Sequence, residues 1–181
     1  MENNTFKGHR INQGKRYTSN LPLGKRRIDL FFSIVFILFA ITCCISDAIP
    51  TLGIPISSSS SNVLVRANYW YASSTDPLFM NPPVWMRLVT GLSAFVYGPF
   101  YLILVYCLLK GKNWIQLPAV IYASMIIIIK GFIVFGVEFF GEPQYRTLNV
   151  LKFLLFNLPY VLLPLLLLIR MRKPLPFTRK F

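Results

Sequence analysis

Long uncharged runs, separated by short polar and basic segments, dominate the hydrophobic pattern of this chain. The runs are Leu30–Ser46, Leu88–Leu109, Asn113–Ile129 with a continuation past one lysine to Phe140, and Phe153–Ile169. A helix needs roughly 17 to 25 apolar residues to cross the hydrocarbon core of a bilayer. Because lipid offers no hydrogen bonds to an open backbone, runs of this length must be helical. The pattern therefore predicts an all-α integral membrane protein with four transmembrane helices.

Composition and charge support this prediction. Of the 181 residues, 55% are hydrophobic and only 14% are charged, whereas a soluble domain averages about 25% charged. The net charge of +13 would suggest a nucleic-acid binder if the basic residues shared one polar face. They instead form short clusters between the apolar runs, so we expect no nucleic-acid partner.

The distribution of Lys and Arg predicts the orientation in the membrane. Seven precede the first run, two lie in the second connection and five follow the last run, against four on the opposite side. Short basic loops stay on the cytoplasmic side, so both termini are predicted to be cytoplasmic. The first run lies too deep in the chain to be a cleaved signal peptide and is expected to remain as a helix.

The same features predict three regions. Residues 1–25 are polar and basic and are expected to form a disordered cytoplasmic tail, which either sets topology or also contacts anionic membrane lipids. Residues 26–173 form the four-helix membrane domain, and residues 174–181 form a short basic cytoplasmic tail.

Prolines predict irregular helices. Pro99 is expected to interrupt the second helix, Pro118 to begin the third, and Pro159 and Pro164 to break the fourth. Each proline removes a backbone hydrogen bond and favours a kink. Kinked helices leave space between them, in which a ligand cavity can form.

Charges inside the membrane are costly and therefore informative. Asp47 lies near the luminal end of the first helix, while Lys130 and Glu138 lie in the third, eight residues apart. One interpretation is structural, either an ion pair of Lys130 with Asp47 or Glu138 or a lysine that snorkels toward the membrane interface. The other is an acidic cavity in which a carboxylate pairs with a ligand's amine or hydroxyl.

Uncharged polar residues in the helices are further candidates for the lining of such a cavity. They are Ser93, Tyr122, Asn157 and Tyr160. The alternative for each is a hydrogen bond between helices.

Other classes of site find no matching residues. The single histidine, His9, lies in the N-terminal tail, and the three cysteines have no metal-ligand spacing. The sequence contains neither a Ser-His-Asp set nor a phosphate-binding glycine loop. We therefore predict no metal, no cofactor, no catalytic residue and a protein that is not an enzyme.

Several short motifs occur in an order that resembles a known family. They are Trp70-Tyr71-Ala72, Asp76-Pro77-Leu78, Pro82-Pro83-Val84-Trp85, Lys110-Gly111, Trp114-Ile115, Pro118-Ala119, Ile121-Tyr122, Pro159-Tyr160 and Pro164. Together they resemble the EXPERA family, which includes emopamil-binding sterol isomerase, and within it the sigma-2 receptor type. The resemblance covers about residues 26 to 174.

The resemblance implies a multi-pass protein of the endoplasmic reticulum membrane, homodimeric, with a pocket inside the bilayer. Such a pocket would accept sterols, lipid-like molecules and cationic amphiphiles. The implied role is in cholesterol homeostasis and trafficking, with a cholesterol-transport membrane protein as partner.

The resemblance also implies site residues. Asp47 and Asp76 correspond to a pair of aspartates, one of which pairs with the ligand's cation while the other holds the first in place. Tyr71 and Tyr160 correspond to pocket walls, and Trp70, which lies in an aromatic cluster of the first luminal loop, is a further candidate for the lining.

Three departures from the family pattern change the expectation. Ser93 stands where the sigma-2 receptor type has an acidic residue in its second helix, and the family's first-helix histidine has no equivalent here. Lys130 in the third helix is also unexpected. A lysine facing Asp47 would compete with a cationic ligand. The histidine and paired glutamates of the isomerase branch are not found, so a sterol Δ8–Δ7 isomerase is the second hypothesis and a ligand-free membrane adaptor the third.

Overall fold

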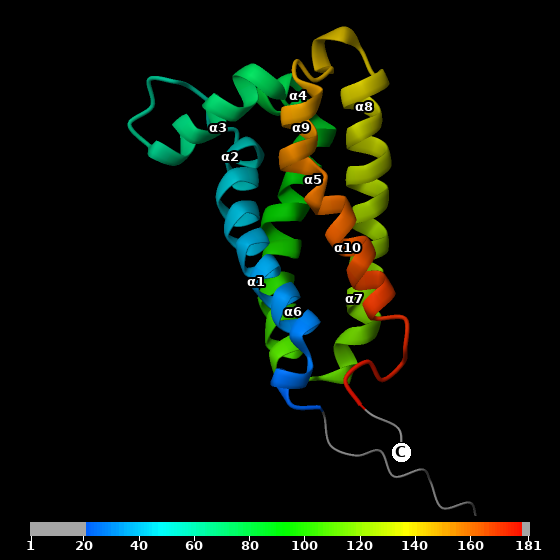
Figure 1. Ribbon diagram of the computed structural model, residues 1–181. Coiled ribbons are helices and arrows are strands. Elements are labelled where there is room, and N and C mark those ends of the chain that lie inside the picture. Colours follow the sequence, from blue (N-terminus) through cyan, green and yellow to red (C-terminus); the bar gives the residue numbers. More distant parts are fainter. Residues whose placement is uncertain (1–20, 179–181) are drawn as a thin grey trace, which may run out of the picture.

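The computed structural model describes residues 21–178, which form an all-helical bundle (Figure 1). Within these residues four helical stretches are long and apolar enough to cross a membrane: Arg27–Thr51, Val84–Lys110, Asn113–Phe140 and Val150–Arg170. The prediction of four transmembrane helices is confirmed. The first and last described residues lie at the same end of the bundle, which we call the cytoplasmic end after the predicted orientation.

Each span is built from more than one helical element. The first and second contain α1 (Arg27–Thr42), α2 (Ala48–Thr51), α5 (Val84–Leu92) and α6 (Gly98–Lys110). The third and fourth contain α7 (Gln116–Ile126), α8 (Phe135–Phe140), α9 (Val150–Asn157) and α10 (Pro159–Arg170). Short 3₁₀ turns occupy Leu23–Lys25, Asn113–Ile115 and Pro143–Tyr145. In Figure 1, α1 packs along α6, and α10 packs along α7.

Two further helices, α3 (Val63–Thr75) and α4 (Pro77–Met80), cover the opposite end of the bundle, which we call the luminal end after the same predicted orientation. The Asn62 side chain caps α3 by accepting the backbone N–H of Leu64 at 2.9 Å. The backbone carbonyl of Thr75 accepts the hydroxyl of Thr147 at 2.7 Å. This contact ties the cap to the connection between the third and fourth spans.

Large apolar side chains cover the outside of the bundle. Ile34, Phe132 and Leu155 are 55%, 72% and 72% exposed. Contiguous exposed apolar surface is rare on soluble monomers but is suited to contact with lipid.

The first three spans each contain a segment that leaves α-helical geometry. In the part of the chain that the structure describes, π-helical segments cover Cys43–Asp47, Ser93–Tyr97 and Ile127–Val134. The fourth span is interrupted at Leu158, between α9 and α10. Such π-helical insertions are uncommon and occur frequently at functional sites.

Three of the four expected proline effects are observed. Pro99 lies in the first turn of α6, directly after a π-helical segment, and Pro159 begins α10. The N–H of Gly98 donates to the carbonyl of Ser93, five residues earlier. Pro118 lies in the first turn of α7, as predicted. The prediction that Pro164 breaks the fourth helix is wrong, because α10 continues through it.

Glycines permit close contact between spans. A Cβ atom on Gly98 would lie 2.6 Å from the Sγ of Cys44, which is too close for two atoms that are not bonded to each other. A Cβ on Gly131 would lie 3.3 Å from a methyl group of Val161. The absence of a side chain at these positions therefore lets the second span approach the first, and the third approach the fourth.

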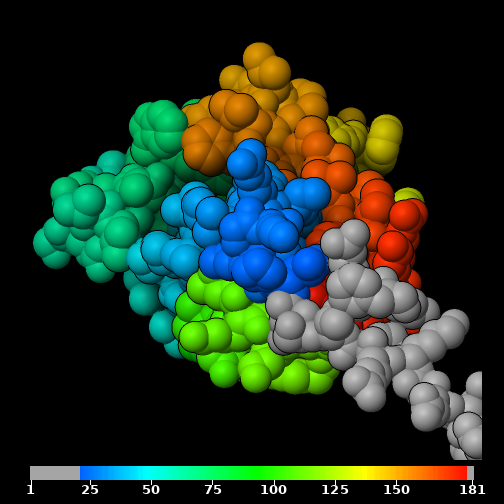
Figure 2. Space-filling view, turned by 60° about the horizontal axis from the view of Figure 1, so that its bottom comes forward, coloured from blue at the N-terminus to red at the C-terminus, as the bar shows by residue number. Residues whose placement is uncertain are grey.

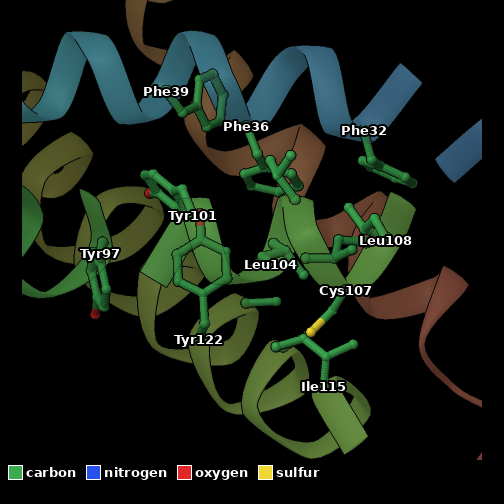
Figure 3. Packing of buried hydrophobic residues seen from close by; sticks show 14 of the residues in the cluster. Phe32, Phe36, Phe39, Tyr97, Tyr101, Leu104, Cys107, Leu108, Ile115 and Tyr122 are labelled. Atoms are coloured by element: carbon green, nitrogen blue, oxygen red, sulfur yellow. The ribbon is translucent and has the colours of Figure 1, made fainter. Parts of the chain in front are cut away.

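Aromatic rings fill the core between α1, α6 and α7 (Figure 3). Phe36, Tyr101 and Tyr122 are at most 4% exposed, and their ring centroids lie 5.3 to 6.1 Å apart. Edge-to-face and tilted pairs at these distances are favourable. The rings hold the cytoplasmic half of the bundle together.

A buried ion cluster closes the cytoplasmic end. Asp29 is fully buried and pairs with Arg26 at 3.0 Å and with Arg170 at 2.9 Å. Arg26 also donates to the carbonyl of Leu108. Both guanidinium groups lie about 5 Å from the ring centroid of Phe177. Figure 2 shows the start of α1 between the end of the second span and the C-terminal segment.

The predicted tails are described only in part. Residues 1–20 and 179–181 lie outside the described residues, so the predicted disorder is not assessed there. Inside them, the N–H of Leu21 donates to the carbonyl of Phe177 at 3.2 Å, and the Phe177 side chain is fully buried. The ends of both predicted tails therefore pack against the bundle.

Candidate ligand-binding site

A cavity of about 340 Å³ lies between the spans at the level of the π-helical segments. Each of these segments contributes lining residues, namely Asp47 from the first, Ser93 and Tyr97 from the second and Lys130 from the third. Asn157 and Tyr160 flank the interruption of the fourth span and also line the cavity. The irregular geometry thus directs polar side chains into the membrane interior.

Most of the predicted site residues meet at this cavity. The eight that line it are Asp47, Trp70, Tyr71, Asp76, Ser93, Lys130, Asn157 and Tyr160. The remaining two, Tyr122 and Glu138, are not in its lining. Apolar side chains, including Met86, Val89, Ile129 and Val134, complete the wall.

A chain of hydrogen bonds fixes Asp76 at the luminal side. Its carboxylate accepts the backbone N–H of Phe79 at 2.7 Å, which caps α4, and the hydroxyl of Tyr71 at 3.2 Å. The amide of Asn157 donates to the same Tyr71 hydroxyl at 2.6 Å. Asp76 is 3% exposed. These three hydrogen bonds link α9, α3 and α4. The Asp-Pro motif therefore has a structural function, in addition to any contact of Asp76 with a ligand.

The pKa of Tyr71 is consistent with its role as a hydrogen-bond donor to Asp76. Burial of the phenol and, secondly, the negative charge of Asp76 raise the pKa of Tyr71 above its ordinary value. The hydroxyl therefore keeps its hydrogen at neutral pH and remains a donor to Asp76.

Asp47 occupies the other side of the cavity. It ends the π-helical segment of the first span and is partly exposed, because it faces the cavity. Ser93 and Cys43 lie beside its carboxylate, and the hydroxyl of Ser93 donates to the Sγ of Cys43 at 3.2 Å. The carboxylate is thus accessible to a molecule within the cavity.

The hypothesis of a structural ion pair of Lys130 is wrong. Among residues 21–178 the ion pairs are those of Asp29 with Arg26 and Arg170, and Lys130 pairs with neither Asp47 nor Glu138. Lys130 lies in a π-helical segment and lines the same cavity as Asp47, but the two charged groups are not in direct contact.

Glu138 and Tyr122 lie outside the cavity wall. Glu138 is 1% exposed, and neither of its carboxyl oxygens has a hydrogen-bond partner among the described residues. Asp76 is its acidic neighbour. Tyr122 belongs to the aromatic core, where its hydroxyl donates to that of Tyr101 at 3.0 Å (Figure 3). It therefore follows the alternative interpretation of a hydrogen bond between helices.

Tyr160 joins the first and fourth spans. Its hydroxyl and that of Thr42 share a hydrogen bond of 2.6 Å, and its ring stacks on Phe39 with centroids 4.1 Å apart. Tyr160 is therefore both a wall of the cavity and a contact between helices.

Sequence analysis missed several polar residues that line the cavity, namely Thr42, Ser46, Asn68, Thr90, Tyr97 and Tyr101. Tyr97 is 4% exposed and lines the cavity, and its hydroxyl has no partner among the described residues. A buried hydroxyl without a partner is unfavourable unless another molecule satisfies it. Tyr97 follows Ser93 by four residues, which places both residues on one face of a helix. This spacing was the feature of the sequence that could have indicated Tyr97 as a lining residue.

The described residues contain no group of three His, Cys, Asp or Glu side chains placed to hold a metal ion. The arrangement is that of a membrane cavity with an apolar wall, two carboxylates and one ammonium group.

Comparison with known proteins identifies the class of this chain. Residues 63–171 match the EXPERA (EXPanded EBP superfamily) family, and the chain belongs to that family. It is similar to "Sigma intracellular receptor 2" of Xenopus tropicalis, with 34% identity over 111 residues. The proteins of the same name from Macaca fascicularis and Homo sapiens are 32% identical over 113 residues.

These matches cover 56% of this chain and 64% of each relative. The chain thus spans less than two thirds of the length of the relatives it matches. The family match begins at residue 63, so Asp47 and the first span lie outside it. The role of Asp47 therefore rests on its position in the cavity.

Proposed function

We propose that this protein is a membrane receptor of the sigma-2 type that binds a sterol or similar lipid within the bilayer. The observation that carries the proposal is the cavity itself, formed where the spans leave regular helical geometry. Its volume of about 340 Å³ falls within the range of small-molecule sites, which are apolar clefts with a few convergent polar groups.

The composition of the wall supports a lipid-like ligand. Met86, Val89, Ile129 and Val134 provide apolar surface, whereas Asp47, Lys130 and Tyr97 provide polar contacts. A cationic amphiphile, which the family resemblance also implies, would meet the ammonium group of Lys130 in the same space. A sterol or another neutral lipid is therefore the better match to this cavity.

Partial filling of the cavity tests the proposal. Val89 lines the cavity, whereas its neighbour Leu88 is 69% exposed toward lipid. Val89→Phe is expected to reduce binding of a photoreactive cholesterol analogue at least about tenfold. Leu88→Phe adds comparable bulk on the outer face and should leave binding unchanged. Equal labelling of both variants would place the lipid outside the cavity.

The proposal includes an intracellular role. The relatives are named intracellular receptors, which supports an intracellular membrane as the location. We propose, following the family resemblance, that this is the membrane of the endoplasmic reticulum and that the protein takes part in cholesterol homeostasis and trafficking. A homodimer and a cholesterol-transport membrane protein as partner are part of the same proposal. Crosslinking of the tagged protein in microsomes, followed by mass spectrometry, tests both associations, and an exclusively monomeric product would argue against the homodimer.

We do not extend the proposal to a sterol isomerase. The relatives carry the name of a receptor, and the residues that line the cavity include no histidine. Failure of the chain to complement an isomerase-deficient yeast strain is the expected result.

A further inference from the structure

We propose that Asp47 and Lys130 together select a lipid alcohol, whose hydroxyl group donates a hydrogen bond to Asp47 and accepts one from Lys130. This inference rests on the proposed function, because it names the headgroup that the same cavity recognises. It adds a specificity determinant, Lys130.

The positions of the two charged groups carry the inference. Asp47 and Lys130 come from the π-helical segments of the first and third spans and both line the cavity. They do not form an ion pair, and both line one cavity of about 340 Å³, so a ligand within the cavity can contact both groups. Within the described residues, the Lys130 ammonium donates no side-chain hydrogen bond.

A ligand group that contacts both Lys130 and Asp47 must both donate and accept hydrogen bonds. An ammonium group only donates hydrogen bonds, and an ionised carboxylate only accepts them. A hydroxyl group does both, so it can bridge Lys130 and Asp47 without adding a charge to the membrane interior. The opposite charges flanking it are then both satisfied, which matters because unpaired charge is costly there.

Other headgroups satisfy only one side of the pair. A protonated amine can donate to Asp47 but is repelled by Lys130. A carboxylate can accept from Lys130 but is repelled by Asp47. A ketone accepts from Lys130 and leaves Asp47 without a donor. Because a site with buried polar groups rejects ligands that leave them unpaired, discrimination among these headgroups is expected to be strong.

Three ligands with the same skeleton test the inference, namely cholesterol, the corresponding 3-ketone and the corresponding 3-amine. Their affinities are measured on the full chain in nanodiscs, by displacement of a photoreactive cholesterol analogue. The wild-type protein is expected to bind the alcohol at least about tenfold more tightly than the ketone or the amine, a difference of about 1.4 kcal/mol.

Single substitutions then separate the two groups. Lys130→Met removes the repulsion and should raise the affinity for the amine relative to the alcohol at least about tenfold. Asp47→Asn should lower the affinity for the alcohol relative to the ketone. Lys112→Met is the matched control, because Lys112 is exposed in the connection between the second and third spans and does not line the cavity, and it should preserve the wild-type order. If Lys130→Met does not fold, Lys130→Gln removes the same charge and retains a polar group.

The outcomes separate this inference from the proposed function. If the wild-type protein binds the amine as tightly as the alcohol, or if loss of the Lys130 charge leaves their ratio unchanged, the inference is overturned while lipid binding stands. If the wild-type protein binds none of the three ligands, the proposed function and the inference both fail.

Discussion

The hydroxyl of Tyr71 donates to the carboxylate of Asp76 across 3.2 Å, and the amide of Asn157 donates to that same hydroxyl. This contact joins α3 to the fourth span at the luminal edge of the cavity. It gives the Trp-Tyr-Ala and Asp-Pro motifs a common physical function, because each holds the other in place.

Removal of the Tyr71 hydroxyl should loosen this edge. Tyr71→Phe deletes one hydrogen bond to a charged acceptor and leaves the Asn157 amide with one partner fewer, so we expect a loss of about 1.5 to 3 kcal/mol in stability. The measurement is thermal unfolding of the detergent-solubilised protein. Tyr69→Phe is the control, and an equal effect of both substitutions would contradict the role of the Tyr71 hydroxyl.

The unpartnered hydroxyl of Tyr97 predicts the opposite behaviour. Tyr97→Phe should leave stability unchanged or raise it slightly, because the hydroxyl has no partner to lose in the described protein. It should lower the affinity for cholesterol several-fold if the hydroxyl contacts the ligand. Tyr122→Phe, by contrast, removes a hydrogen bond to Tyr101 and should reduce stability. Binding that is insensitive to Tyr97→Phe would exclude this contact.

The buried ion cluster predicts a large effect at the cytoplasmic end. Asp29→Asn removes the charge that Arg26 and Arg170 share, and breaking a buried ion pair from one side costs about 3 to 5 kcal/mol. The expected result is a strongly lowered unfolding temperature or loss of folded protein. Glu142→Gln, at an exposed carboxylate, should have little effect, and a stable Asp29→Asn protein would contradict the structural role of the cluster.

The close approach of the first two spans predicts that a second substitution, at Cys44, restores the stability lost by a substitution at Gly98. Gly98→Ala places a methyl group 2.6 Å from the Sγ of Cys44 and should destabilise the protein by about 1 to 3 kcal/mol. Cys44→Ala in the same chain should recover much of this loss. Gly136→Ala is the control, since no atom lies within 4 Å of a Cβ there. Additive effects of Gly98→Ala and Cys44→Ala would show that the two positions are not coupled.

The sequence predicted the four spans because length and hydropathy depend only on local composition. It also predicted most of the polar residues around the cavity, since charged and aromatic residues are conspicuous within apolar runs. Resemblance to a family supplied Asp76 and Tyr71, which lie in the luminal cap and not in a span.

The geometry of the site was harder to predict from the sequence. A π-helical segment has the same composition as the α-helix around it, so the direction of Lys130 could not be derived from helical periodicity, and the predicted ion pair does not form. One of the two partners of Asp29, Arg170, lies 141 residues away in the sequence, and no local pattern connects two such positions. Tyr97 was missed because a tyrosine in an apolar run resembles ordinary core packing until its hydroxyl is found without a partner.

The most direct test of ligand binding is a structure of the protein determined in the presence of cholesterol. The account predicts elongated density within the cavity, with its polar end between Asp47 and Lys130. Density restricted to the outer, lipid-facing surface, with the cavity closed by side chains of the protein, would contradict it.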